Sequence, residues 1–202
     1  MKILFLTLMA SAALATSAMA APTATVTGGY TFNKVGGDSQ FVAADVASQL
    51  PASPFSVDLF TQDNFPVNTP VRSGSTQHIE VGLSVPVIGP TYVRAAVGDV
   101  AHDYSFHYIL NGNKLVLNPT ATDHQYYNLT AGINLPVTKD VILDASEKYE
   151  NTFTNTNQFE TWTTSVGASY ALNNNLALRV GYARTEGNTR SDTVEAGAKV
   201  SF

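Results

Sequence analysis

After residue 20, apolar residues alternate with polar or small ones in segment after segment, and this period of two constrains the fold more than any other feature. In the clearest segment, Ile79, Val81, Leu83 and Val85 are each separated by one polar or small residue. Neighbouring side chains of a β-strand point to opposite sides, so this pattern predicts strands with one apolar face. Eight segments are predicted as strands: 24–32, 79–85, 91–101, 127–135, 141–149, 162–170, 176–182 and 194–202.

The connections between these strands fall into two classes, which alternate along the chain. The tight turns, rich in Pro, Asn and Gly, are 86–90, 136–140 and 172–175. The longer polar links are 36–76, 102–125, 150–159 and 186–192. An up-and-down barrel with short turns at one end and long loops at the other produces this order. The predicted fold is therefore all-β, an eight-stranded antiparallel up-and-down transmembrane β-barrel.

Alternation alone does not decide which face of the barrel is apolar. A lipocalin-like barrel is apolar inside, whereas a membrane barrel is apolar outside. Several alternating segments have the nine to eleven residues that a tilted strand needs to cross a bilayer. The polar face consists largely of Gly, Ser, Thr and Asn, which fill a narrow interior. Both features favour the membrane barrel.

Aromatic residues near the ends of the apolar face favour the same orientation. Trp162 and Tyr170 are eight residues apart. At ~3.4 Å per residue and a tilt of ~40° they are separated by about 21 Å along the membrane normal, close to the height of the apolar band. The predicted aromatic girdle consists of Tyr30, Phe32, Tyr127, Tyr149, Trp162, Tyr170 and Tyr182.

Residues 1–20 have the features of a secretory signal peptide. Lys2 supplies a short positive region, an apolar core follows, and the segment ends in a small-x-small cleavage site. Cleavage is predicted between Ala20 and Ala21, which leaves 21–202 as a single barrel domain. A transmembrane anchor is the alternative, but it needs ~20 consecutive apolar residues, and the purely apolar stretch is shorter.

Composition excludes several classes of function. Only 13% of the residues are charged, against roughly 25% in soluble domains. The chain has no cysteine, which excludes disulfides and thiolate metal sites. The net charge is -5 and no basic run occurs, so nucleic acid is not expected as a partner. No cofactor and no metal site are predicted.

The end of the chain resembles the closing strand of bacterial outer-membrane barrels, in which alternating apolar residues lead to a terminal Phe. The residues that carry this resemblance are Val194, Ala196, Ala198, Val200 and Phe202. Over the whole mature chain, the order of strands, turns and loops is similar to the membrane domain of outer membrane protein A and to the smaller protein X and Ail group. The chain departs from the first by ending at the barrel, and from the second by a first loop of about 40 residues (36–76).

This resemblance implies a location and a set of partners. The chain is expected in the bacterial outer membrane, in contact with its lipid and lipopolysaccharide. The closing strand is the signal read by the barrel-assembly machinery in that family. An extracellular ligand would bind through the long loops.

If the apolar residues face lipid, a set of charged residues points into the lumen. An isolated charge inside a narrow barrel is costly, whereas paired and hydrogen-bonded charges are tolerated. These residues are therefore predicted to form a lumenal ion-pair network, which fills the barrel or, alternatively, gates small ions. They are Glu80, Arg94, Asp144, Arg179, Glu195 and Lys199.

Two further carboxylates, Asp99 and Glu147, fall on the lipid face in this register. They lie at the outer rim, or a β-bulge shifts the phase of the strand there. The link 36–76 is also unusually apolar. Residues 41–50 are compatible with one or two helical turns, and Phe55, Leu59, Phe60 and Phe65 are expected to cap the barrel mouth or to contact a partner.

Histidines around the second long loop raise the question of catalysis. A His beside a carboxylate can act as a general base, and the pairs His102-Asp103 and Asp123-His124 meet this condition, with His107 between them. No motif frames Ser105, the nearest nucleophile, and the histidines lack a metal-ligand spacing. The chain is therefore predicted not to be an enzyme.

Three functional classes remain open at this point. The favoured one is a structural or surface-interaction barrel with extracellular loops. The second is a narrow channel for ions or small solutes. The third, least favoured, is a hydrolase at the barrel rim that would use His102, His107 or His124.

Overall fold

The fold is described from a computed structural model that covers residues 23–33, 38–67, 76–102, 105–111, 114–120, 124–153, 160–188 and 190–202. The predicted signal peptide and its cleavage site at Ala20 and Ala21 lie outside these residues. Within the described part of the chain, no helix is long and apolar enough to cross a membrane.

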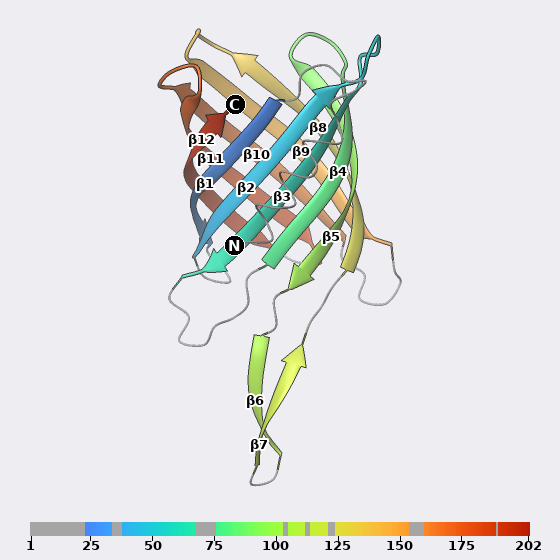
Figure 1. The fold of residues 1–202 in the computed structure, drawn as a ribbon, viewed down its shortest axis with the longest axis vertical. Coiled ribbons are helices and arrows are strands. Elements are labelled where there is room, and N and C mark those ends of the chain that lie inside the picture. Colours follow the sequence, from blue (N-terminus) through green and yellow to red (C-terminus); the bar gives the residue numbers. More distant parts are fainter. Residues whose placement is uncertain are drawn as a thin grey trace.

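Ten of the strands in the described residues close into a barrel, in which each strand is antiparallel to the two strands beside it (Figure 1). The strands β6 and β7 form a separate hairpin inserted between β5 and β8, and β1 pairs with β12 to close the wall. The barrel strands are β1 (Thr23–Asn33), β2 (Ser39–Gln49), β3 (Ser56–Pro66), β4 (Thr76–Pro86), β5 (Thr91–His102), β8 (His124–Pro136), β9 (Val141–Thr152), β10 (Glu160–Ala171), β11 (Leu176–Gly187) and β12 (Ser191–Ser201).

The closed antiparallel barrel agrees with the sequence-based prediction, but the number of strands was wrong. The eight predicted segments correspond to β1, β4, β5 and β8 to β12. The two additional strands, β2 and β3, lie in the segment that was expected to be a long loop. They pair with each other without interruption from Ser39↔Pro66 to Gln49↔Ser56, and with β1 and β4 on either side. Residues 41–50 are therefore not helical.

The connections alternate between the two ends of the barrel, but their lengths do not follow the predicted division into short turns and long loops, since the loop-end connections 34–38 and 188–190 are no longer than the turn-end connection 50–55. The turn end carries the connections 50–55, 87–90, 137–140 and 172–175. The loop end carries the others, including the hairpin of β6 (Ser105–Asn111) and β7 (Lys114–Thr120). This hairpin projects well beyond the barrel wall, at the bottom of Figure 1.

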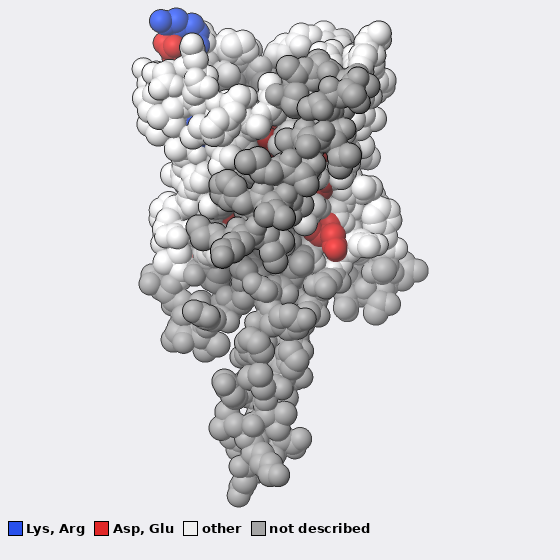
Figure 2. Space-filling view, viewed as in Figure 1, with Lys and Arg blue, Asp and Glu red and all other residues white. Residues whose placement is uncertain are grey.

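The outer surface of the wall is apolar. Leu129, Val166 and Val180 are about half exposed, at 50%, 50% and 53%, although none of them lies in a loop. On the face drawn in Figure 2, few charged side chains interrupt the described wall between the two ends. Since Ile79 and Val81 are also exposed, the apolar residues of the alternating strands point away from the barrel axis.

Asp99 and Glu147 lie on this outer surface without a bulge. The register of β4 with β5 and of β9 with β10 is continuous through both positions. Asp99 is the fourth residue from the loop end of β5, which agrees with the rim alternative. Glu147 lies midway along β9, where its Oε2 accepts a hydrogen bond of 2.7 Å from Thr164 Oγ1.

Candidate functional site: the barrel lumen

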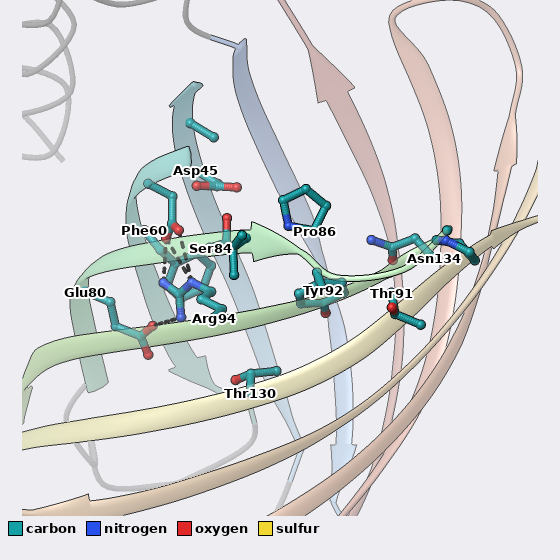
Figure 3. Close-up of a pocket in the computed structure, with 15 residues that line it drawn as sticks. Asp45, Phe60, Glu80, Ser84, Pro86, Thr91, Tyr92, Arg94, Thr130 and Asn134 are labelled. Carbon is teal, nitrogen blue, oxygen red and sulfur yellow. Dashed lines mark hydrogen bonds and ion pairs between the residues drawn. The ribbon is translucent and has the colours of Figure 1, made fainter. Parts of the chain in front are cut away.

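Arg94 of β5 is the centre of the largest ion-pair cluster inside the barrel. Its Nη2 lies 2.5 Å from Asp58 Oδ2 and its Nε donates to the same carboxylate, while its Nη1 lies 2.8 Å from Glu80 Oε2 (Figure 3). The three side chains come from β3, β4 and β5, which are neighbours in the wall. A planar guanidinium fits two carboxylates in this fork geometry, and each contact is a charge-assisted hydrogen bond.

Two buried side chains of β8 complete the hydrogen bonding of Glu80. Tyr126 donates its hydroxyl proton to Glu80 Oε1 over 2.8 Å, and Asn128 Nδ2 donates to the same oxygen over 3.1 Å. Tyr126 and Asn128 are 0% and 1% exposed. The Glu80 carboxylate therefore has partners on both oxygens, which offsets part of the cost of removing it from water.

A second cluster lies between β9 and β11. Arg179 Nη1 and Nη2 contact the two oxygens of Asp144 at 2.6 and 2.9 Å, a bidentate pair across β10. Glu195 and Lys199 of β12 line the same cavity as Arg179. Within the described part of the chain, neither of them is joined to another side chain by an ion pair of 4 Å or less.

All six charges that sequence analysis assigned to the lumen lie on the inner side of the wall, but ion pairs join only four of them, Glu80 with Arg94 and Asp144 with Arg179, in two separate clusters. Glu195 and Lys199 line the lumen outside these ion pairs. Further inner-face charges were missed. Asp45 and Asp58 belong to β2 and β3, which were expected to be loop, so no inward face was assigned to them. Lys148 and Glu150 of β9, whose side chains are 2.8 Å apart, were overlooked although they share the period of Asp144.

The lumen is not completely filled by these side chains. A cavity of about 630 Å³ is bordered by Asp58, Glu80 and Arg94, and it reaches Pro86 and Pro90 at the turn end (Figure 3). A second cavity of about 260 Å³ is bordered by Arg179 and Glu195. Eight strands leave an interior just wide enough for side chains, and the diameter grows with strand number. The two additional strands therefore provide the room for these cavities.

The seven residues of the predicted aromatic girdle all lie on strands with their side chains on the outer face. Tyr127, Tyr149 and Trp162 form a row near the loop end, with ring centroids 6.3 and 4.8 Å apart. Tyr30 and Phe32 pack against each other at 5.1 Å on β1. Tyr170 lies at the turn end of β10 and Tyr182 lies midway along β11, both exposed.

The closing strand β12 carries the residues of the predicted assembly signal on its outer face. Val194 is exposed there. Phe202 follows the last residue of β12 and is also exposed, and its amide donates to Ala24 O over 2.9 Å. The role of these residues as a signal stays a prediction.

The residues of the hydrolase hypothesis are described only in part. The side chains of His102, Ser105 and His107, and the whole of Asp103 and Asp123, lie outside the described residues. The ring of His124 lies 6.4 Å from that of Tyr126. In the portion of the chain that is described, no group of three or more His, Asp or Glu side chains is arranged to hold a metal ion.

Comparison with known proteins supports the barrel type. No protein-family profile matches the chain, and no curated protein matches it in sequence. The KdgM porin, solved in complex with a disordered oligogalacturonate, superposes with a TM-score of 0.51 at 12% identity, covering 88% of this chain and 99% of that chain. This likeness shows a common fold, the closed antiparallel barrel.

Two other solved barrels are similar at lower scores. The NanC porin has a TM-score of 0.49 at 10% identity, covering 88% of this chain and 98% of that chain. The outer membrane protein Ail of Yersinia pestis has a TM-score of 0.42 at 12% identity, covering 89% of this chain and 99% of that chain. The eight strands implied by the predicted resemblance to outer membrane protein A, protein X and Ail are wrong for this chain.

Proposed function

We propose that this chain is an integral β-barrel of the bacterial outer membrane with a structural or surface-interaction role, and that it is not an enzyme. The observation that supports this most strongly is the distribution of side chains across the wall. Half-exposed Leu129, Val166 and Val180 lie outside, whereas the ion pairs of Arg94 and Arg179 lie inside. A barrel in water would have the opposite distribution, and lipid is the solvent that this wall fits.

The surface-interaction part of the proposal is supported by the β6–β7 hairpin. It extends beyond the loop end of the barrel in Figure 1, and its strands are paired from Ser105↔Thr120 to Asn111↔Lys114. A two-stranded hairpin has little stability of its own. A projecting hairpin of this kind is suited to contact a partner outside the membrane. The proposed partners are lipid, lipopolysaccharide, the barrel-assembly machinery through β12, and an extracellular ligand.

Heat modifiability tests the membrane barrel. The protein is extracted from membranes in detergent and run on a gel with and without boiling. The unboiled chain is expected to migrate as a separate, compact band, because a closed barrel resists the detergent at room temperature. Identical migration of the two samples in several detergents would refute the proposal.

Epitope insertion tests the orientation and the display of the hairpin. One tag is inserted between β6 and β7 at positions 112–113, and a control tag is inserted at Lys139 in the turn between β8 and β9. Antibody is expected to bind intact cells carrying the hairpin tag, and to bind the control tag only after the outer membrane is permeabilised. Antibody binding to the control tag on intact cells, with the hairpin tag bound only after permeabilisation, would contradict a barrel whose loop end faces the outside of the cell.

A further inference from the structure

The two lumenal cavities meet at Asp45 of β2 and Phe60 of β3, since these two side chains border both of them. The larger cavity begins at the turn end, where Pro86 and Pro90 line it. The smaller cavity continues to Phe41, the third residue from the loop end of β2. The smaller cavity is also lined by Thr25 and Lys199 near the turn end, so the two cavities lie partly side by side. Asp45 and Phe60, which are paired on neighbouring strands, form the boundary between them.

The lumen carries an excess of negative charge. Six carboxylates and four basic groups lie on the inner faces of the described strands, which leaves two more negative than positive charges. Clefts of one sign bounded by low-dielectric walls focus the electric field and concentrate counter-ions. The groups are Asp45, Asp58, Glu80, Asp144, Glu150 and Glu195 on the negative side, and Arg94, Lys148, Arg179 and Lys199 on the positive side.

Asp45 differs from the other carboxylates near the larger cavity. Asp58 and Glu80 are both held by Arg94. Asp45 forms no such ion pair, and its buried Oδ1 has no hydrogen-bond partner among the described residues. A buried carboxylate oxygen without a partner is costly. Asp45 is therefore a carboxylate that borders both cavities and that no arginine neutralises through an ion pair.

We propose that the lumen conducts small monovalent cations and that Asp45 determines the preference for cations at the boundary it forms with Phe60. The inference rests on the membrane-spanning orientation proposed above. Potassium ions entering from the turn end meet the negative excess of the larger cavity and then the unpaired Asp45. Arg94 and Arg179 do not attract chloride, because bidentate carboxylates already neutralise them.

Planar-bilayer recording tests this proposal. The protein purified from membranes is inserted into a bilayer between KCl solutions of different concentration, and the reversal potential gives the ratio of potassium to chloride permeability. A ratio of about 5 or more is expected from two excess negative charges in a low-dielectric pore. Absence of conductance, or a ratio of about one or below, would overturn the proposal.

Two variants assign the preference to particular residues. Asp45→Asn removes one of the two excess charges, so the logarithm of the permeability ratio is expected to fall by about half. Phe60→Ala widens the boundary, so conductance is expected to rise. Asp99→Asn on the outer face is the matched control and is expected to leave both quantities unchanged. An unchanged permeability ratio in Asp45→Asn would overturn the assignment of Asp45.

Folding is checked separately by heat modifiability of every variant. A wild-type barrel that migrates as a compact band but does not conduct would refute the channel and leave the proposed membrane barrel intact. A wild-type chain that is not heat-modifiable would refute both. If Asp45→Asn does not fold, the wild-type permeability ratio still decides whether the lumen prefers cations.

Discussion

Arg94 illustrates how a single residue holds the wall of the barrel together. Its guanidinium joins Asp58 and Glu80, which are 22 residues apart in the chain, and all three side chains are at most 18% exposed. Two buried carboxylates without a cation would repel each other in a low dielectric. The cluster therefore fixes β3, β4 and β5 in one register, in addition to their backbone hydrogen bonds.

Replacing this arginine tests the energetic weight of the cluster. Arg94→Ala leaves Asp58 and Glu80 buried and uncompensated, so the free energy of unfolding is expected to fall by about 3–5 kcal/mol. Arg184→Ala is the matched control, because Arg184 pairs with Glu186 at the exposed outer surface. Urea unfolding in lipid vesicles, followed by the gel shift, measures both variants. Equal stability of the two would show that the inner cluster contributes no more than a surface ion pair.

Two tyrosines that each donate to a carboxylate allow a narrower test at the same scale. Tyr126 donates to buried Glu80 and Tyr182 donates to Asp192 over 2.7 Å at the exposed face. Tyr126→Phe is expected to cost about 1.5–3 kcal/mol, since a buried hydrogen bond to a charged group is lost. Tyr182→Phe is expected to cost less than about 0.5 kcal/mol. The same unfolding assay compares the two variants. A larger loss of stability in Tyr182→Phe than in Tyr126→Phe would contradict the burial of Tyr126 and the exposure of Tyr182.

At the scale of elements, the strands that the sequence failed to predict are those in which a phenylalanine interrupts the polar or small residues of the inner face. Most strands alternate small or polar residues inside with apolar residues outside, and the period is visible. In β2, Phe41 and Ala43 lie inside while Val42 lies outside, so apolar residues occupy both faces and the period disappears. In β3, Phe60 faces the lumen in the same way.

The charged residues of the lumen could be predicted from the sequence only where the strands that carry them could be predicted. Glu80, Arg94, Asp144 and Arg179 follow from alternation, because each belongs to a strand with a clear period. Asp45 and Asp58 could not be predicted in this way, because their segments were expected to be loop and a residue has an inner or outer face only within a strand. The pairing of Arg94 with Asp58 also depends on which strands are neighbours, and alternation within one strand contains no information about its neighbour.

Protease protection distinguishes a strand pair from a loop in the segment 39–66. As part of the wall, β2 and β3 are expected to resist chymotrypsin added to intact cells, although the segment contains Phe41, Phe55, Phe60 and Phe65. Backbone groups held in a barrel wall are not accessible to a protease. Fragments are separated on a gel and identified by mass spectrometry. Rapid cleavage within 39–66 at a rate similar to the loop-end connections would favour eight strands.

At the scale of the whole molecule, one property decides whether the barrel belongs in lipid: the apolar outer wall. Val166 is half exposed, and its neighbours across β9 and β11 are Ala145 and Tyr182. In water, an exposed valine tolerates arginine with a change of about 0.5 kcal/mol or less. At the middle of a bilayer, the same arginine costs about 2–4 kcal/mol. The two solvents therefore predict different outcomes for one substitution.

Val166→Arg is accordingly expected to lower the free energy of unfolding from lipid vesicles by about 2–4 kcal/mol. Asn174→Arg in the exposed turn between β10 and β11 is expected to change it by less than about 0.5 kcal/mol. Reversible folding in vesicles, followed by tryptophan fluorescence of Trp162, measures both. Because Trp162 lies on the outer face near the loop end, its emission also reports insertion. A stability of Val166→Arg equal to that of the turn variant would mean that this wall faces water, and the lipid-facing orientation would have to be abandoned.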